Sequence, residues 1–67
     1  MKIENGMKCK YKPFNEMVTG TVVSASEDGN EFIVTDSPAC KVPQYDDSRR
    51  YFTKEDIGKS VFFEAQA

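Results

Sequence analysis

The chain contains no histidine and no tryptophan, and its only cysteines are Cys9 and Cys40. A structural zinc site takes four cysteine or histidine ligands, so two thiols are too few for a site within one chain. Without histidine, no cysteine or serine has the neutral base that usually activates a nucleophile. The acidic pairs at 27–28, 46–47 and 55–56 fit turns, neighbouring arginines and a helix start better than a metal site. We therefore expect no metal, no cofactor and no enzymatic activity.

Long apolar runs are missing too. Nowhere do about 18 apolar residues follow one another, and the first residues carry no signal-peptide pattern. We expect a cytoplasmic protein with no membrane partner, in which both cysteines are buried free thiols. The 9 basic and 11 acidic side chains give a net charge of −2, which disfavours broad electrostatic capture of nucleic acid.

The chain is short, and its 67 residues predict one domain spanning residues 1–67. Its hydrophobic content of 39%, with five Phe and three Tyr, is enough for one compact core. Small acidic domains without a recognisable catalytic or metal-binding motif are also typical of the accessory proteins of phages and mobile elements. This analogy concerns composition alone.

The clearest strand pattern lies in residues 7–12, where apolar side chains alternate with Lys8, Lys10 and Lys12. This period is that of a strand with one buried face. Two interpretations fit these lysines, here called the lysine face: contact with the phosphates of a single-stranded nucleic acid, or protection of an edge strand against aggregation. We favour edge protection.

A hairpin is expected next. The β-branched run 18–25 predicts a second strand, in which Gly20 indicates a bend or a bulge. Asp28-Gly29 is the signal of a tight turn, and residues 32–35 have the composition of the returning strand.

The remaining elements are shorter. Residues 40–42, between two prolines, predict a short or edge strand, and the polar segment 44–50 is predicted to be the longest loop. Residues 53–58 predict one helical turn pinned to the core by Ile57, and residues 61–63 the last strand. Five short strands with one helical turn before the last predict a mostly β fold, a small, partly open β-barrel that is OB-like or SH3-like.

Three stretches resemble the cold-shock OB domain: Gly20-Thr21-Val22, Gly29-Asn30-Glu31-Phe32-Ile33 and Gly58-Lys59-Ser60-Val61-Phe62-Phe63-Glu64. That family has G-T-V, G-F-G-F-I and G-x-x-V-x-F-E segments in the same order. The resemblance implies an OB barrel that stacks the bases of a single strand on exposed aromatic side chains. Of the family's stacking positions only Phe32 matches, and the others hold Ser24, Asn30, Lys41, Pro43 and Gln44. The stacking platform is therefore not carried over.

The Arg-Arg-Tyr-Phe run at 49–52 is the main basic and aromatic cluster. Guanidinium groups beside aromatic rings bind bases, phosphates or acidic protein surfaces. Alternatively, one ring anchors the loop in the core while both arginines pair with Asp46 and Asp47. The run is the best single candidate for a binding site.

We predict a noncatalytic binding module that mediates protein–protein interaction or self-association. The alternative is single-stranded nucleic-acid binding, which requires the lysine face and the Arg49-Arg50 loop to form one positive surface. A protein partner requires an exposed apolar patch instead. The candidate binding surface consists of Lys8, Lys10, Lys12, Lys41, Tyr45, Arg49, Arg50 and Tyr51.

Overall fold

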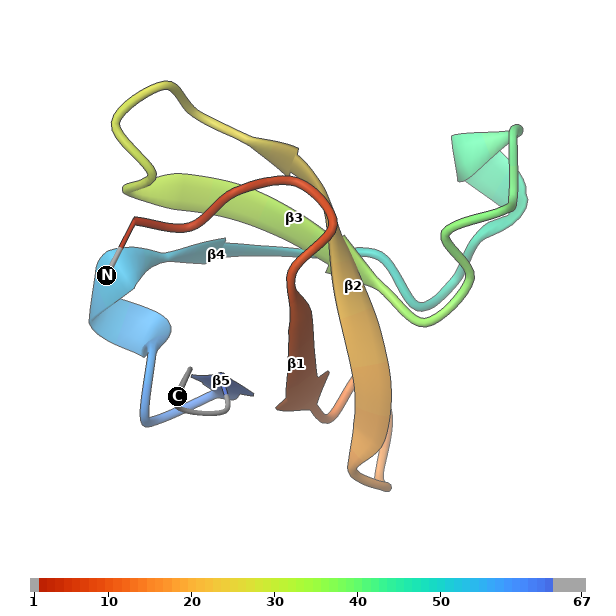
Figure 1. Cartoon of the computed structure of the whole chain (residues 1–67). Helices are drawn as coiled ribbons and strands as arrows, with labels where there is room; N and C mark the ends of the chain where they lie inside the picture. The colour runs from red at the N-terminus through yellow and green to blue at the C-terminus, as the bar shows by residue number, and fades with distance from the viewer. Residues whose placement is uncertain (1, 64–67) are drawn as a thin grey trace.

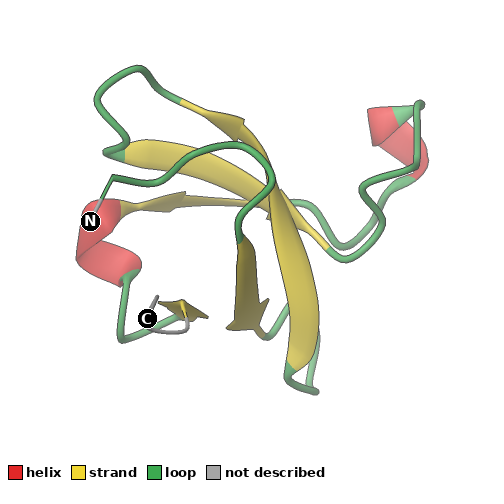
Figure 2. Ribbon diagram, in the orientation of Figure 1, coloured by secondary structure: helices red, strands yellow, loops and turns green. Residues whose placement is uncertain are grey.

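The computed structural model describes residues 2–63, in which five strands and two short 3₁₀ helices form one curled sheet with attached turns (Figures 1 and 2). The strands are β1 (Lys8–Tyr11), β2 (Val18–Ala25), β3 (Glu31–Thr35), β4 (Arg50–Thr53) and β5 (Val61–Phe63). The 3₁₀ helices are η1 (Pro43–Tyr45) and η2 (Lys54–Asp56). The sheet has the order β4-β3-β2-β1-β5 and curls into a half-barrel, so the predicted fold class is confirmed.

The strand order separates the two barrel types that the sequence left open. β1 to β4 are neighbours in chain order, all antiparallel, and β5 pairs with the other side of β1. An OB barrel is a Greek key, whereas this sheet is a meander extended by its last strand, with a 3₁₀ turn directly before that strand. This connectivity favours the SH3-like type.

The hairpin between β2 and β3 is confirmed. Asp28 Oδ1 accepts hydrogen bonds from Ser26 Oγ at 2.7 Å and from the Asn30 N–H at 3.0 Å, and Gly29 has a φ of 74°. The carboxylate thus fixes a turn whose backbone requires a glycine.

Gly20 has a different role from the predicted one. The irregularity in the β2–β3 register lies between Val22 and Ser24, not at the glycine. A Cβ atom on residue 20 would lie 2.5 Å from Tyr11 Cε1 and 2.6 Å from Val34 Cγ1. Glycine is therefore required here because two buried side chains occupy the space of a side chain.

The strand expected at residues 40–42 is not formed, and the fourth strand is β4 instead. Residues 40–42 lie in the connection 36–49, where the Cys40 N–H donates to the Ser37 carbonyl at 3.0 Å and the Tyr45 N–H to the Val42 carbonyl at 2.9 Å. Local turns thus use backbone N–H and C=O groups that pairing with a neighbouring strand would need. The flanking prolines have no N–H to donate to such a strand. The longest connection is 36–49, rather than the predicted 44–50, and its η1 turn stands away from the sheet (Figure 1).

β1 is an inner strand, so edge protection does not explain the lysine face. It pairs with β2 on one side and with β5 on the other. Lys8 Nζ donates to Thr21 Oγ1 at 2.9 Å and Lys10 Nζ to Thr19 Oγ1 at 2.5 Å. These lysines therefore cover the outer face of the sheet over β1 and β2.

The core lies inside the curl of the sheet. Around Phe32, the ring of Phe63 lies at 5.6 Å and that of Phe52 at 6.0 Å between centroids. The predicted helical turn is η2, with the Thr53 N–H donating to Asp56 Oδ2 at 3.0 Å and Ile57 packing against the core. The fully buried apolar residues are Ile3, Cys9, Tyr11, Val22, Phe32, Val34 and Val61.

Candidate binding groove

A groove of about 440 Å³ lies between β4, β5 and the connection from β1 to β2. Its apolar surface comes from Met17, Phe52 and Phe62. The exposed fraction of the Met17 side chain is 47% and that of Phe62 is 39%. Large apolar side chains exposed side by side are typical of interaction sites.

Three cations surround this apolar surface: Lys12, Arg50 and Lys59. None of the described residues that line the groove is acidic, although acids outnumber bases in the chain as a whole. The groove, defined hereafter by these three cations and the three apolar side chains, is therefore locally positive on an acidic protein.

The floor of the groove is continuous with the core. Phe52 packs edge-on against Tyr11, with ring centroids 6.1 Å apart, and also contacts Phe32. Tyr11 is fully buried and its hydroxyl donates to the Ser48 carbonyl at 2.7 Å. Close packing beneath the floor holds its shape, so a ligand would meet a preformed surface.

Arg50 is held rigidly at the rim. Its Nη1 donates to the carbonyls of Asp47 and Arg49, both at 2.7 Å, and its Nη2 donates to the Pro13 carbonyl at 2.5 Å. The guanidinium also lies 5.3 Å from the centroid of the Phe14 ring, a cation–π distance. These bonds go to main-chain carbonyls, not to the carboxylates of Asp46 and Asp47 that the sequence suggested as partners.

The lysine face borders the groove. Lys10 on β1 is directly opposite Phe62 on β5, so their side chains share the outer face of the sheet. Lys12 follows two residues later and lines the groove itself. The structure thus brings Lys12 and Arg50 into one site, with Lys10 adjoining it through Phe62.

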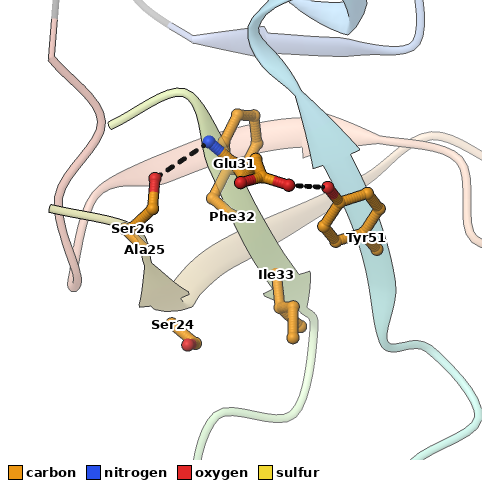
Figure 3. Close-up of a pocket in the computed structure, with 7 residues that line it drawn as sticks. All are labelled: Ser24, Ala25, Ser26, Glu31, Phe32, Ile33 and Tyr51. Atoms are coloured by element: carbon orange, nitrogen blue, oxygen red, sulfur yellow. Dashed lines mark hydrogen bonds between the residues drawn. The ribbon is translucent and has the colours of Figure 1, made fainter. Parts of the chain in front are cut away.

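The run 49–52 is divided between the two faces of β4. Successive strand residues point to opposite sides, so Arg50 and Phe52 line the groove and Tyr51 lies in a separate hollow of about 260 Å³ (Figure 3). There the Tyr51 hydroxyl donates to Glu31 Oε1, a bond that raises the pKa of Tyr51 above its ordinary value. Tyr51 is therefore not part of the groove.

The other predicted site residues belong to the connection 36–49. Lys41 is exposed in it, and Tyr45 in η1 is 79% exposed. Tyr45 and Phe14 line a hollow of about 300 Å³ together with three aspartates, at 36, 46 and 47. This hollow is acidic, in contrast to the groove.

Asp46 anchors the connection to the barrel. Its carboxylate accepts hydrogen bonds from Ser48 Oγ at 2.6 Å, from the Ser48 N–H at 3.1 Å and from Thr35 Oγ1. Desolvation raises the pKa of Asp46. The hydrogen bonds from Ser48 and Thr35 and the charge of Arg49 together lower it by more, so the pKa of Asp46 is below its ordinary value. The anchored loop ends at β4, and Asp46 thereby helps to place Arg50 at the rim.

Comparison with protein-family models, with curated proteins and with solved structures finds no match to this chain. Among residues 2–63 there is no helix long and apolar enough to cross a membrane. Within the same range no cluster of three metal-ligating side chains occurs. The site must therefore be interpreted from its own geometry.

Sequence reasoning missed half of the groove: Met17, Lys59 and Phe62. Met17 lies in the connection after Pro13, and Lys59 in the turn after η2. Phe62 is the middle of three strand residues, Val61-Phe62-Phe63, of which the outer two point inward. Because all three are apolar, the sequence alone does not show which of them faces outward.

Proposed function

We propose that the protein is a noncatalytic binding module that holds a protein partner, or a second copy of itself, in the groove. The observation that carries this proposal is the exposure of Met17 and Phe62 beside three cations in one preformed depression. Covering the remaining exposed surface of each side chain contributes on the order of 1 kcal/mol, and the cations fix orientation and partner choice.

The proposal is tested with immobilised wild-type protein and two matched variants. Phe62→Ser changes the groove, and Tyr45→Ser changes an exposed ring on the loop. Quantitative mass spectrometry of retained proteins, together with sedimentation of the isolated chain, is expected to show a partner or a dimer that Phe62→Ser loses and Tyr45→Ser keeps. Loss with Tyr45→Ser alone would place the interaction on the loop and contradict the proposal.

Single-stranded nucleic-acid binding is the second candidate, and one observation favours it. The lysine face continues into the groove, because Lys10 is opposite Phe62 and Lys12 lines the groove itself. Arg50 adds a further cation there, so part of the positive surface that this function requires is present. Phe62 is an aromatic on which a base could stack.

Fluorescence anisotropy of labelled single-stranded RNA and DNA at low and physiological salt tests the second candidate. Saturable, salt-sensitive binding that an Arg49→Ala/Arg50→Ala variant loses would move nucleic acid to first place. Absence of binding at low salt would eliminate it.

A further inference from the structure

We propose that the groove binds an extended acidic peptide segment of a partner protein, with its main chain added to the free edge of β4 and one apolar side chain seated between Met17 and Phe62. This inference rests on the proposed function and specifies the chemistry of the partner. Three features of the described residues support it: the charge of the rim, the apolar floor and the unpaired edge of β4.

The charge of the rim selects an anion. Lys12, Arg50 and Lys59 surround the groove and no described lining residue is acidic, while the chain carries a net charge of −2. A positive groove attracts carboxylates and repels basic segments at this site, although the protein as a whole is acidic. Arg50 is already immobilised by its bonds to three main-chain carbonyls, so little side-chain entropy is lost when it receives a carboxylate.

The floor selects an apolar side chain. Met17 is an unbranched, adaptable side chain, and Phe52 and Phe62 provide rigid rings. A volume of about 440 Å³ falls within the range of ligand sites, roughly 300–1,000 Å³. The groove therefore has room for one large side chain with its neighbouring backbone.

The edge of β4 offers main-chain hydrogen bonds. Among residues 2–63, β4 is the first strand of the sheet order and pairs with β3 alone. The Lys54 N–H continues that ladder by donating to the Asn30 carbonyl at 2.9 Å. Because the backbone groups of a strand alternate in direction, the N–H groups of Thr53 and Tyr51 point away from β3. The Thr53 N–H donates to the Asp56 carboxylate. The N–H and C=O of Tyr51 face the open edge of the sheet.

These features together favour a peptide over a nucleic acid. An added strand supplies the alternating N–H and C=O groups that the β4 edge pairs with, and a sugar-phosphate backbone has none. Tyr51 presents its main chain to this edge while its side chain is engaged by Glu31 on the outer face. An acidic partner segment with a single large apolar residue therefore satisfies the edge, the floor and the rim at once.

The test uses three fluorescein-labelled decapeptides with one central leucine among serines. Four further positions carry glutamate in the first peptide, neutral glutamine in the second and lysine in the third. Labelled oligo(dT) of ten nucleotides is the fourth probe. Anisotropy is measured at about 20 mM salt, where ion pairs are weakly screened, and at about 150 mM salt, which is physiological. The matched variants are Lys12→Gln/Lys59→Gln in the groove and Lys2→Gln/Lys41→Gln outside it, which change the net charge equally.

We expect the glutamate peptide to bind about tenfold more tightly than the glutamine peptide at low salt, as two or three exposed ion pairs allow. This preference should be lost in the groove variant and kept in the outside variant. Equal binding of glutamate and glutamine peptides, abolished by Phe62→Ser, would overturn this inference and leave the proposed function standing. Binding of oligo(dT) and of no peptide would overturn both, and no binding of any probe would overturn this inference alone.

Discussion

Removing the Asp46 carboxylate should destabilise the protein by about 2 kcal/mol. Asp46→Ala deletes the acceptor of three hydrogen bonds from Ser48 and Thr35, whose side chains are 4% and 0% exposed. A buried donor left without an acceptor costs about 1–3 kcal/mol. The two hydroxyls lie 2.9 Å apart and keep each other as partners, which limits the loss to the middle of that range.

Thermal unfolding followed by circular dichroism measures this loss. In a domain of this size, about 2 kcal/mol corresponds to a decrease in Tm of roughly 8–16 °C. The neighbouring Asp47→Ala is the matched control, because Asp47 is exposed and should change Tm by less than about 3 °C. Equal effects of the two substitutions would refute the anchoring role of Asp46.

The Asp46 contribution should also depend on pH. The pKa of Asp46 in the folded protein lies below its ordinary value, so the folded state favours the carboxylate. Its stabilisation is therefore complete above the unfolded pKa of about 3.9 and disappears as the pH falls through the folded pKa. The difference in free energy of unfolding between wild type and Asp46→Ala should be constant above about pH 5 and shrink below about pH 4.

Two further predictions concern the core. Gly20→Ala should lower the free energy of unfolding by about 1–3 kcal/mol in urea titrations, because the added Cβ meets the buried side chains of Tyr11 and Val34; a change below about 0.5 kcal/mol would contradict this packing. Of the two thiols expected to be buried, only Cys9 is, and Cys40 is partly exposed in the connection 36–49. Ellman's reagent should therefore modify Cys40 alone in the folded protein, since burial also raises the pKa of Cys9 to about 11. Both thiols should react in denaturant, and rapid modification of two thiols in the native protein would refute the burial of Cys9.

The fold was predictable where local signals agree with one another. Asp28-Gly29 between two β-branched runs predicted the β2–β3 hairpin, and Gly58 together with Ile57 predicted the turn before β5. The fourth strand was predicted at 40–42, between two prolines, but these residues form local turns and the strand is β4 instead. Tyr51, Phe52 and Thr53 are strong strand formers, and they are the signal that could have located it.

The site was less predictable than the fold, since its residues come from three separate parts of the chain, 12–17, 50–52 and 59–62. The adjacent pair Arg50 and Tyr51 suggested one cluster, yet strand alternation sends them to opposite faces. Lys12 and Lys59 are far apart in sequence and meet only because β5 returns to β1. The closing of the curled sheet, and not any local motif, creates the groove.

Two-dimensional ¹H–¹⁵N NMR of the labelled protein, titrated with the glutamate decapeptide, tests the central claim most directly because it reports where the ligand lies. We predict that the largest amide shifts fall in residues 12–17, 50–53 and 59–62, with the Tyr51 amide among them as it gains a main-chain partner. Shifts confined to the connection 36–49, or to Lys8 and the outer face of β2, would contradict the assignment of the groove as the binding site.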